Sequence, residues 1–245
     1  MGSASRLKFL VCSDAHIDAT TAGLPRFGDV KSAVYETITA ARDQGCELWC
    51  FAGDWSDPDT KRAWAAAEVA VDVFSVLRYY ERSQLWITGN HDVVEDGQGS
   101  SVLGPLRSAA THAKDFAVVS HVPMVAIFSG VAFLTLPYTP IALNYDPSEA
   151  VRRLAKDCKG AREVVVLGHL NAEGIAPGSE TTDMPRGRDV FWPLDEIRKQ
   201  LPGALLIGGH YHRRQVYEGL QIVGSLERLT LGEEHNSPGY LICEV

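Results

Sequence analysis

The stretch Trp49-Cys50-Phe51-Ala52-Gly53-Asp54-Trp55-Ser56-Asp57 decides the fold, because a short apolar run within it ends abruptly in a polar turn. Four consecutive apolar residues, 49–52, are typical of a strand that is buried on both faces of a sheet. Asp54 follows at the carboxyl end of this predicted strand. A carboxylate beside buried backbone is costly unless a positive charge compensates it, and a metal ion is the obvious candidate. Taken alone, Asp54 is better explained as a turn or cap residue.

The same pattern, an apolar strand candidate followed by ligand-type side chains, occurs five times along the chain. The predicted strands cover residues 7–12, 49–52, 85–88, 164–167 and 205–207. The side chains that follow them are Asp14 and His16, Asp54, Asn90 and His91, His169, and finally His210 and His212. Sites in open α/β sheets form beyond the carboxyl ends of the strands, so we expect these groups to converge. Each histidine alone is better explained as an ordinary core or surface residue, but the repetition favours a metal centre.

The segments between these strands predict an α/β fold in a single domain over residues 1–245. Apolar spacing predicts helices over 30–41 and 102–113, a long helix that starts at 58–60, a helix from 146 to about 160 and a short helix over 194–201. The long helix should bury a face that includes Trp64 and Leu77. Strands over 117–119, 124–128 and 131–136 are close enough in sequence to be antiparallel neighbours, and the tail from 213 to 245 suggests hairpins.

Composition describes an ordinary globular chain, with 45% hydrophobic and 22% charged residues among 245. No apolar run is long enough to cross a membrane and no signal peptide is evident, so we expect a cytoplasmic protein without a membrane partner. The formal net charge of −8 argues against nucleic-acid binding by bulk electrostatics. It does not exclude such binding, because acidic metal ligands contribute to the count and two bound divalent ions would reverse the local charge.

The predicted donor set contains carboxylates, imidazoles and one amide, without a thiolate. Such a set suits two divalent ions of intermediate character, with Mn favoured and Fe or Zn as alternatives, and a shared carboxylate implies that there are two of them. In two-metal hydrolysis the ions lie about 3.5 to 4 Å apart, generate hydroxide at neutral pH and hold a phosphoryl oxygen. The pattern therefore predicts a phosphoesterase.

The motifs Asp14-x-His16, Gly53-Asp54, Gly89-Asn90-His91-Asp92, Gly168-His169 and Gly209-His210-x-His212 resemble those of the calcineurin-like metallophosphoesterase superfamily, in the same order. The resemblance implies two mixed β-sheets packed together and flanked by helices. It also implies a first metal held by Asp14, His16, Asp54 and His212, and a second held by Asp54, Asn90, His169 and His210. His91 would contact the phosphate and protonate the leaving oxygen, oriented by Asp92.

A narrower resemblance is to the SbcD-type DNA-repair nucleases, the bacterial relatives of the double-strand-break nucleases. It rests on Gly53-Asp54-Trp55-Ser56-Asp57, on His169 followed by Glu173-Gly174 and Gly178-Ser179-Glu180, on Gly224-Ser225-Leu226-Glu227-Arg228 and on Gly232-Glu233-Glu234. The last two stretches are also consistent with ordinary hairpin turns. The resemblance implies a Mn-dependent exonuclease or endonuclease that forms homodimers and pairs with an SbcC-like coiled-coil ATPase. These nucleases continue into a capping domain and an ATPase-binding region, which we do not expect within residues 1–245.

DNA is therefore the expected substrate, and five arginines on loops beside the motifs are candidate contacts. They are Arg26, Arg186, Arg188, Arg213 and Arg214, of which the adjacent pair after His212 is the most suggestive. A solvated surface is an equally good explanation for the other three. Two alternatives stay open: a small-molecule phosphatase or cyclic-nucleotide phosphodiesterase of the same superfamily, and a metal-free binding module on the same fold.

Overall fold

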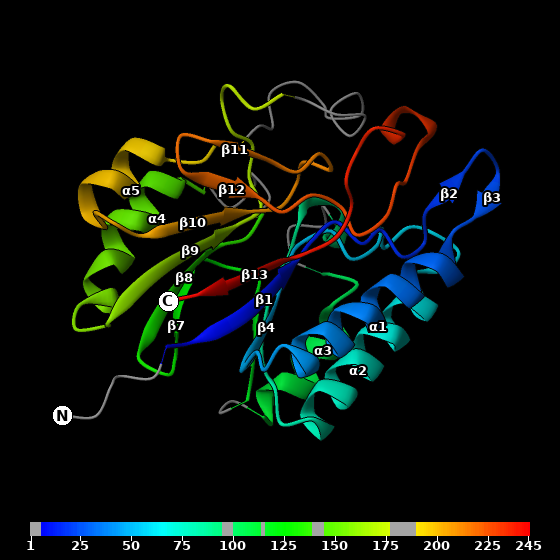
Figure 1. Cartoon of the computed structure of the whole chain (residues 1–245), viewed down its shortest axis with the longest axis horizontal. Coiled ribbons are helices and arrows are strands. Elements are labelled where there is room, and N and C mark those ends of the chain that lie inside the picture. The colour runs from blue at the N-terminus through cyan, green and yellow to red at the C-terminus, as the bar shows by residue number, and fades with distance from the viewer. Residues whose placement is uncertain (1–5, 95–99, 114–115, 139–144, 177–189) are drawn as a thin grey trace.

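The computed structural model describes residues 6–94, 100–113, 116–138, 145–176 and 190–245. Two β-sheets pack face to face in these regions, and helices cover the outer face of each sheet (Figure 1). The predicted α/β sandwich is thus confirmed. No helix in these regions is long and apolar enough to span a bilayer.

The first sheet has five strands in the order β13-β1-β4-β5-β6. Strands β1 (Lys8–Cys12), β4 (Leu48–Ala52), β5 (Ser83–Ile87) and β6 (Ala117–Ser120) are parallel, and β13 (Leu241–Glu244) joins β1 antiparallel. All five residues of β4 are buried, which fits its continuous apolar run. Because the four strands run the same way, the loops after β1, β4 and β5 leave the sheet at the same edge.

The second sheet has six strands in the order β11-β12-β10-β9-β8-β7. Strands β8 (Val131–Leu136), β9 (Glu163–Gly168), β10 (Leu205–Gly208) and β12 (Leu220–Ile222) are parallel, whereas β7 (Met124–Phe128) and β11 (Gln215–Tyr217) are antiparallel edges. A short ribbon of β2 (Thr20–Thr21) and β3 (Leu24–Pro25) projects from the loop after β1. Figure 1 shows this ribbon beside the loop that precedes β13.

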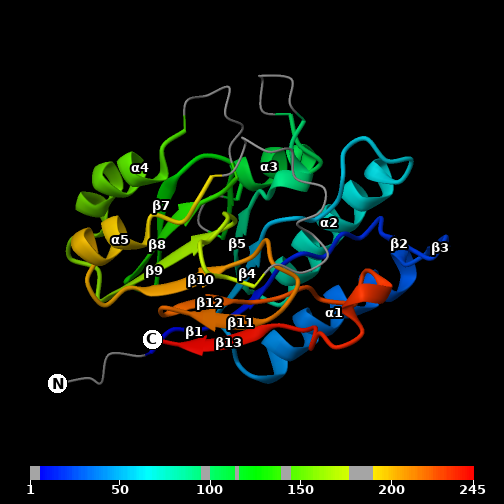
Figure 2. The ribbon, with the colours of Figure 1, turned by 90° about the horizontal axis from the view of Figure 1, so that it is seen from above.

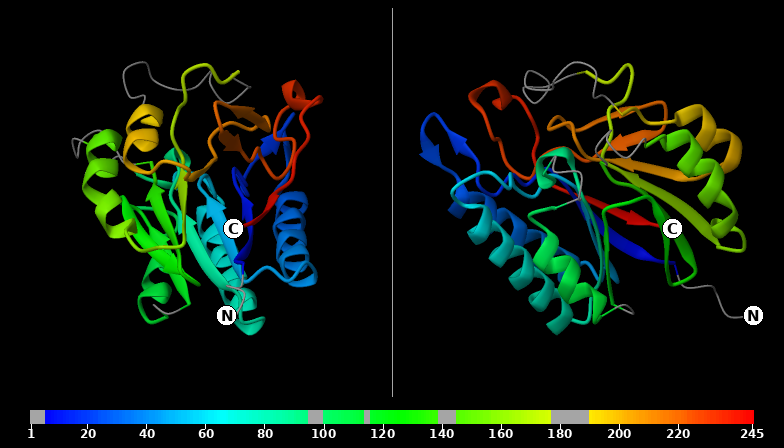
Figure 3. Two further views of the ribbon diagram at one scale, coloured as in Figure 1. Left: turned by 60° about the vertical axis from the view of Figure 1, so that its left-hand side comes forward. Right: turned by 180° about the vertical axis from the view of Figure 1, so that it is seen from behind.

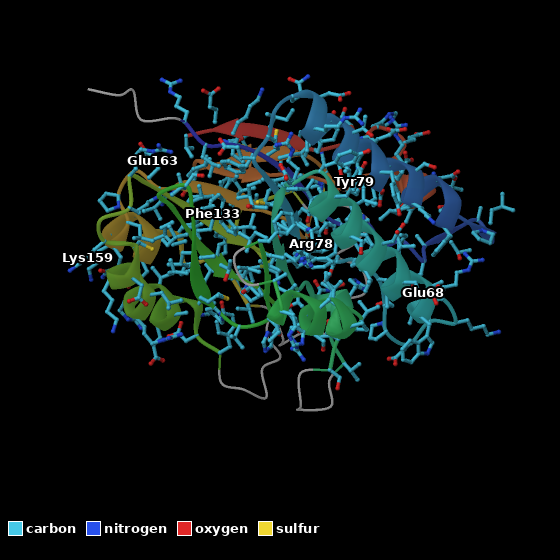
Figure 4. The ribbon with its side chains drawn as sticks, turned by 90° about the horizontal axis from the view of Figure 1, so that it is seen from below. Glu68, Arg78, Tyr79, Phe133, Lys159 and Glu163 are labelled. Carbon is cyan, nitrogen blue, oxygen red and sulfur yellow. The ribbon has the colours of Figure 1, made fainter. Side chains whose placement is uncertain are left out.

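Three layers of apolar side chains hold the sandwich together. Helices α1 (Phe27–Asp43), α2 (Ala63–Tyr79) and α3 (Gly104–Thr111) cover the first sheet, while α4 (Pro147–Leu154) and α5 (Leu194–Gln200) cover the second (Figure 2). Between the sheets, Phe9 meets Phe133 edge to face at 5.3 Å between ring centroids. The views in Figure 3 show the helices outside and the sheets inside, and Figure 4 shows Phe133 in the interior, with Glu68 and Tyr79 on the exposed side of α2. Short 3-10 turns cover Asn90–Asp92, Ala155–Cys158 and Leu231–Glu233.

Three local predictions are wrong. Strand β6 does not pair with β7, because the chain crosses from one sheet to the other within three residues, where Ser120 Oγ lies 2.7 Å from Thr135 Oγ1. Helix α2 begins at Ala63 rather than at 58–60, and its first turn leaves Trp64 81% exposed instead of in the core. The tail forms one hairpin, β11 with β12, and then returns to pair with β1.

The aromatic cluster beneath β4 generates a stability prediction. The ring of Trp86 lies 4.8 Å from that of Trp49 and 5.4 Å from that of Trp55, and its indole N–H donates to Gln84 Oε1. We expect Trp86→Ala to lower the free energy of unfolding by about 3 to 5 kcal/mol, because it leaves a large cavity and an unpaired amide. Chemical denaturation measures this change. Trp64, which is exposed, provides the matched control. Trp64→Ala should change the free energy of unfolding by less than about 0.5 kcal/mol.

Candidate metal centre

The predicted ligands come together at the carboxyl ends of the strands in two groups of three. Donor atoms of Asp14, His16 and His212 all lie within 4.8 Å of one another. The same is true of Asp54, His169 and His210. Five loops contribute to the centre, those after β1, β4, β5, β9 and β10. The sequence prediction that these side chains converge on one edge therefore agrees with their placement in the fold.

Asp54 lies between the two groups and faces both of them. Its Oδ2 is 3.0 Å from His169 Nε2 in its own group and 3.6 Å from His16 Nε2 in the other. Asn90 completes the second group, with Oδ1 at 3.2 Å from His169 Nε2 and 3.0 Å from His210 Nδ1. One carboxylate oxygen is thus placed where two neighbouring cations would share it.

The contacts among the donors place nitrogen lone pairs where one metal ion would satisfy them together. His16 Nε2 and His212 Nε2 face each other at 3.2 Å, and both rings cannot donate along that line. A cation satisfies both nitrogen lone pairs at once. Ligands bound to one ion at about 2.0 to 2.2 Å lie roughly 3 Å apart, which is the spacing seen here. The residues present therefore fit a two-metal site, in which Asp14, His16 and His212 would hold one ion and Asp54, His169 and His210 the other. Asn90 lies beside the second group, and Asp54 also faces the first.

Outer hydrogen bonds present one nitrogen of each of three imidazoles to the centre. His169 Nδ1 donates to Ala52 O at 2.7 Å, which leaves Nε2 facing Asp54. His210 Nε2 donates to Asn171 Oδ1 at 3.0 Å, which leaves Nδ1 for the ion. His212 Nδ1 donates to Glu233 Oε1 at 2.9 Å, which leaves Nε2. Fixing the ring tautomer in this way pre-organises a metal ligand.

Charge states in the centre also suit metal binding. Burial lowers the pKa of His210 to about 3, and burial likewise holds the pKa of His16 well below its usual range, so both rings are neutral ligands at pH 7. Burial would raise the pKa of Asp54, but the surrounding histidines outweigh it and keep that carboxyl ionised. Burial would lower the pKa of His169, but Asp54 raises it to about 9. A cation would replace the His169 proton, because both are attracted by the same carboxylate.

The loops approach so closely that only glycine fits at three positions. A Cβ on Gly89 would lie 2.2 Å from Asp54 Oδ1, and one on Gly209 would lie 2.1 Å from Ser13 Oγ. Gly53 combines a φ of +96° with a Cβ direction that would meet the His169 ring at 2.3 Å. These glycines are therefore required for the histidines and Asp54 to reach one another.

Strained backbone marks the same site. Asp14, His16, Asp54 and His210 all have positive φ, between 42° and 83°, although none of them is glycine. Such residues cost of order 1 to 3 kcal/mol each and cluster where function over-determines the conformation. A bifurcated hydrogen bond opposes the strain at Asp14, because the His210 backbone N–H donates to both oxygens of its carboxylate, at 3.0 and 3.1 Å.

Asp92 does not orient His91, contrary to the sequence prediction. Its buried carboxylate instead accepts backbone N–H groups of Gly89, Asp54 and Trp55, at 2.8, 2.9 and 2.7 Å. It therefore fastens the loop after β5 to the loop after β4. The pKa of Asp92 is raised to about 7 by burial and by the Asp54 charge, against these donors.

The carboxylate that contacts His91 is Asp57, at 2.8 Å from Nδ1. Burial would lower the pKa of His91, but Asp54 and Asp57 together raise it to about 10, so the ring is a cation at pH 7. His91 also lies against His16, with ring centroids 4.8 Å apart, while its backbone N–H donates to Asp54 Oδ1. It borders the metal groups without belonging to either of them.

A cleft of about 400 Å³ opens over the centre. Its lining includes Ala19 and Thr20 from the loop after β1, Leu229 and Thr230 from the loop before β13, and Asp57 and Thr60 from the segment before α2. Among the described residues, the lining includes Asp18, Asp54 and Asp57 but no lysine or arginine. The protein's own charge in the cleft is thus carried by carboxylates and histidines.

The candidate DNA contacts that the structure describes, Arg26, Arg213 and Arg214, are not in this lining. Arg26 binds Asp29 at 2.6 Å and Glu227 at 3.2 Å, and its guanidinium also donates to Arg228 O. Arg214 donates to the backbone oxygens of Val223 and Tyr240. Arg213 is exposed beside His212. Arg186 and Arg188 lie outside the described residues.

Three neighbours of the ligands were not predicted from sequence: Asp57 as the partner of His91, Asn171 at His210 and Glu233 at His212. Asp57 belongs to the stretch that decides the fold, so its position three residues after Asp54 was the available signal. Asn171 follows His169 by two residues. Glu233 contacts His212 across 21 residues, and nothing in its local sequence predicts that contact.

Comparisons with known proteins agree with this geometry. The chain is similar in fold to the crystal structure of a dimetal phosphatase from Danio rerio, with a TM-score of 0.55, 14% sequence identity, and coverage of 90% of this chain and 88% of that one. No curated protein matches the sequence. The model of the calcineurin-like phosphoesterase family matches residues 7–214. The chain therefore belongs to the calcineurin-like phosphoesterase family.

Proposed function

We propose that this phosphoesterase cleaves phosphodiester bonds in DNA, with Mn²⁺ as its working ion. The observation that carries the choice of a diester is the charge of the cleft, whose described lining holds three aspartates and, besides its histidines, no lysine or arginine. A phosphodiester carries one negative charge and a phosphomonoester close to two at neutral pH. Asp18 and Asp57, the two lining carboxylates outside the metal groups, therefore disfavour the monoester more strongly.

His91 is the proposed general acid. When bound, two divalent ions would supply hydroxide at neutral pH and offset charge on the phosphoryl oxygens. The chain's own contribution is a protonated imidazole in the cleft, with Nδ1 held by Asp57 and Nε2 left to donate to the leaving oxygen. Because the carboxylates raise its pKa to about 10, His91 holds that proton at pH 7.

DNA as the substrate rests on the SbcD-like stretches and on the position of Arg213. Gly53-Asp54-Trp55-Ser56-Asp57 contains both the shared carboxylate and the partner of His91. Arg213 follows His212 directly and is exposed, and we propose that it contacts a phosphate that neighbours the reacting one. Pairing with a coiled-coil ATPase and formation of a homodimer belong to the same proposal.

A small-molecule substrate, such as a cyclic nucleotide or another small phosphate ester, is the second candidate. The observation that favours it is that Arg26 and Arg214 are engaged within the protein, which leaves them unsuited to a DNA backbone. A cleft of about 400 Å³ also has the size of a small-ligand site.

Substrate comparison separates the two candidates. With added Mn²⁺, we expect hydrolysis of labelled single-stranded or duplex DNA, faster hydrolysis of an aryl diester than of an aryl monoester, and loss of DNA cleavage as salt is raised. Arg213→Ala should weaken the DNA reaction and its salt dependence but leave aryl diester hydrolysis unchanged. Hydrolysis of small esters with no cleavage of DNA would favour the second candidate.

Substitutions in the centre separate metal binding from proton transfer. His91→Ala should keep two ions per chain but lose turnover by about 10²- to 10⁴-fold, because it removes only the general acid. Asp54→Asn should lose both the bound ions and turnover, because it removes the carboxylate that faces both metal groups. Elemental analysis after dialysis and initial rates measure the two properties. His235→Ala, at a side chain that is 92% exposed, is the control. A His91→Ala protein with normal rates on a substrate with a poor leaving group would contradict the assignment.

The pair formed by His91 and Asp57 predicts a pH dependence. The acidic form of His91 is the active one, so activity should fall as pH rises through its pKa. Asp57→Asn removes one of the carboxylates that raise this pKa, and the alkaline limb of kcat/KM should therefore move to lower pH. Asp59→Asn, at a neighbouring exposed carboxylate, should leave the limb in place. An unchanged limb in Asp57→Asn would show that the pair does not set it.

A further inference from the structure

Glu233 is a buried carboxylate that the reaction described above does not use. It is 1% exposed and lies at the end of the 3-10 turn Leu231–Glu233, within the loop of residues 225–236, here called the cleft loop. Its Oε1 accepts from His212 Nδ1 at 2.9 Å, and Thr230 Oγ1 lies 3.4 Å from the same oxygen. Its Oε2 accepts from the Leu229 backbone N–H at 2.8 Å. A buried carboxylate is costly unless it is paired and hydrogen-bonded, and these contacts satisfy both oxygens of Glu233.

The first contact of Glu233 sets the orientation of a metal ligand. Because His212 Nδ1–H is held by the carboxylate, the ring can present only Nε2 to the group that contains Asp14 and His16. The charge of Glu233 also makes the imidazole a stronger donor towards a cation. Without this contact, His212 could rotate about its side-chain bonds away from His16 Nε2, which now lies 3.2 Å away.

The second contact of Glu233 reaches the wall of the cleft. Leu229 and Thr230 line the cleft, and the amide of Leu229 is bound by the other oxygen of the same carboxylate. On its far side the cleft loop is tied to the β2–β3 ribbon, since Thr21 Oγ1 donates to Leu229 O at 2.6 Å and Arg26 donates to Arg228 O at 2.8 Å. Figure 1 shows the ribbon and the cleft loop side by side.

We propose that Glu233 is a positioning residue that holds His212 towards the first metal position and couples occupancy of that position to the cleft loop. One oxygen of Glu233 contacts the metal ligand His212, and the other contacts the cleft wall at Leu229. Metal binding at the first position therefore stabilises the wall, and loosening of the wall weakens metal binding there. The proposal rests on the two-metal site and not on the identity of the substrate. Glu233 itself touches neither the ions nor the ester.

The simpler explanation is that Glu233 only closes a turn. Its contacts to Leu229 and Thr230 would serve that purpose alone. The two explanations differ at the metal. A residue that closes a turn affects both metal positions equally through overall stability, whereas a positioning residue on His212 affects only the position that His212 serves.

Titration of the full-length protein with Mn²⁺, in the absence of substrate, tests the proposal. In calorimetry we expect Glu233→Ala to weaken one of two binding steps by about 10- to 100-fold and to leave the other unchanged. Glu233→Gln should have a smaller effect on the same binding step. If its amide oxygen accepts from His212 Nδ1, the amide nitrogen faces the Leu229 N–H and that contact is lost. In the opposite orientation the Leu229 contact is kept and the His212 contact is lost. Glu234→Ala is the matched control, since the adjacent side chain is 73% exposed and contacts only His235 among the ion pairs described.

Asn171→Ala supplies a control at the other position, because Asn171 binds His210 in the way that Glu233 binds His212. Asn171→Ala should weaken the Mn²⁺ binding step that Glu233→Ala leaves unchanged. Equal weakening of both steps by Glu233→Ala, or no weakening of either, would overturn the proposal. If circular dichroism shows that Glu233→Ala does not fold, the Mn²⁺ titration of Glu233→Gln takes its place. Weakening of one binding step then supports the proposal, and equal weakening of both steps, or of neither, overturns it.

Hydrogen exchange tests the coupling itself. In the wild type, Mn²⁺ should slow exchange of the amides in the cleft loop, including that of Leu229, and in Glu233→Gln this protection should be reduced at equal Mn²⁺ occupancy. Protection that is the same in both proteins would contradict the coupling. Neither measurement uses DNA or any other ester, so failure of the proposed DNA activity and failure of this proposal are distinguishable.

Discussion

The position of the Asp54 carboxylate is the constraint on which the rest of the site depends. It is 1% exposed, its backbone has a positive φ of 61°, and its Oδ2 faces histidines of both metal groups. Such an arrangement is unfavourable for a lone anion in a protein interior. Protons on His169 and His91 offset part of its charge, but His16 and His210 are neutral and do not compensate the remainder. Divalent cations would compensate the charge of Asp54, which explains why the chain tolerates both a strained backbone and a buried carboxylate at this position.

Everything around Asp54 serves to bring separate loops to it and hold them. Gly53, Gly89 and Gly209 allow backbones to approach within distances that a side chain would block. Asp92 then binds backbone N–H groups from two of these loops, so a residue that appears catalytic in the motif acts instead as a clamp. Contacts outside the ligands fix which imidazole nitrogen faces inward. Through Glu233 this support extends to the cleft wall, which joins metal binding to the surface that meets the substrate.

The α/β elements and the ligands were predictable because they depend on local patterns, whereas the packing of two sheets was expected only from the family resemblance. A buried strand that ends in Gly53-Asp54 or Gly209-His210 is visible in a few residues, and parallel strands bring such ends together. The predictions that were wrong concern features that depend on contacts between distant segments. The pairing of His91 with Asp57 instead of Asp92 is decided by how two loops meet, and β6 joins β5 because the chain changes sheet after Ser120. The exposure of Trp64 likewise depends on where α2 begins.

Anomalous diffraction from crystals grown with Mn²⁺ tests the central claim most directly, because it locates the ions independently of activity. The account predicts two peaks about 3.5 to 4 Å apart, one beside His16 and His212 and the other beside His169 and His210, with Asp54 Oδ2 within bonding distance of both. A single peak, or two peaks that do not share Asp54, would contradict it.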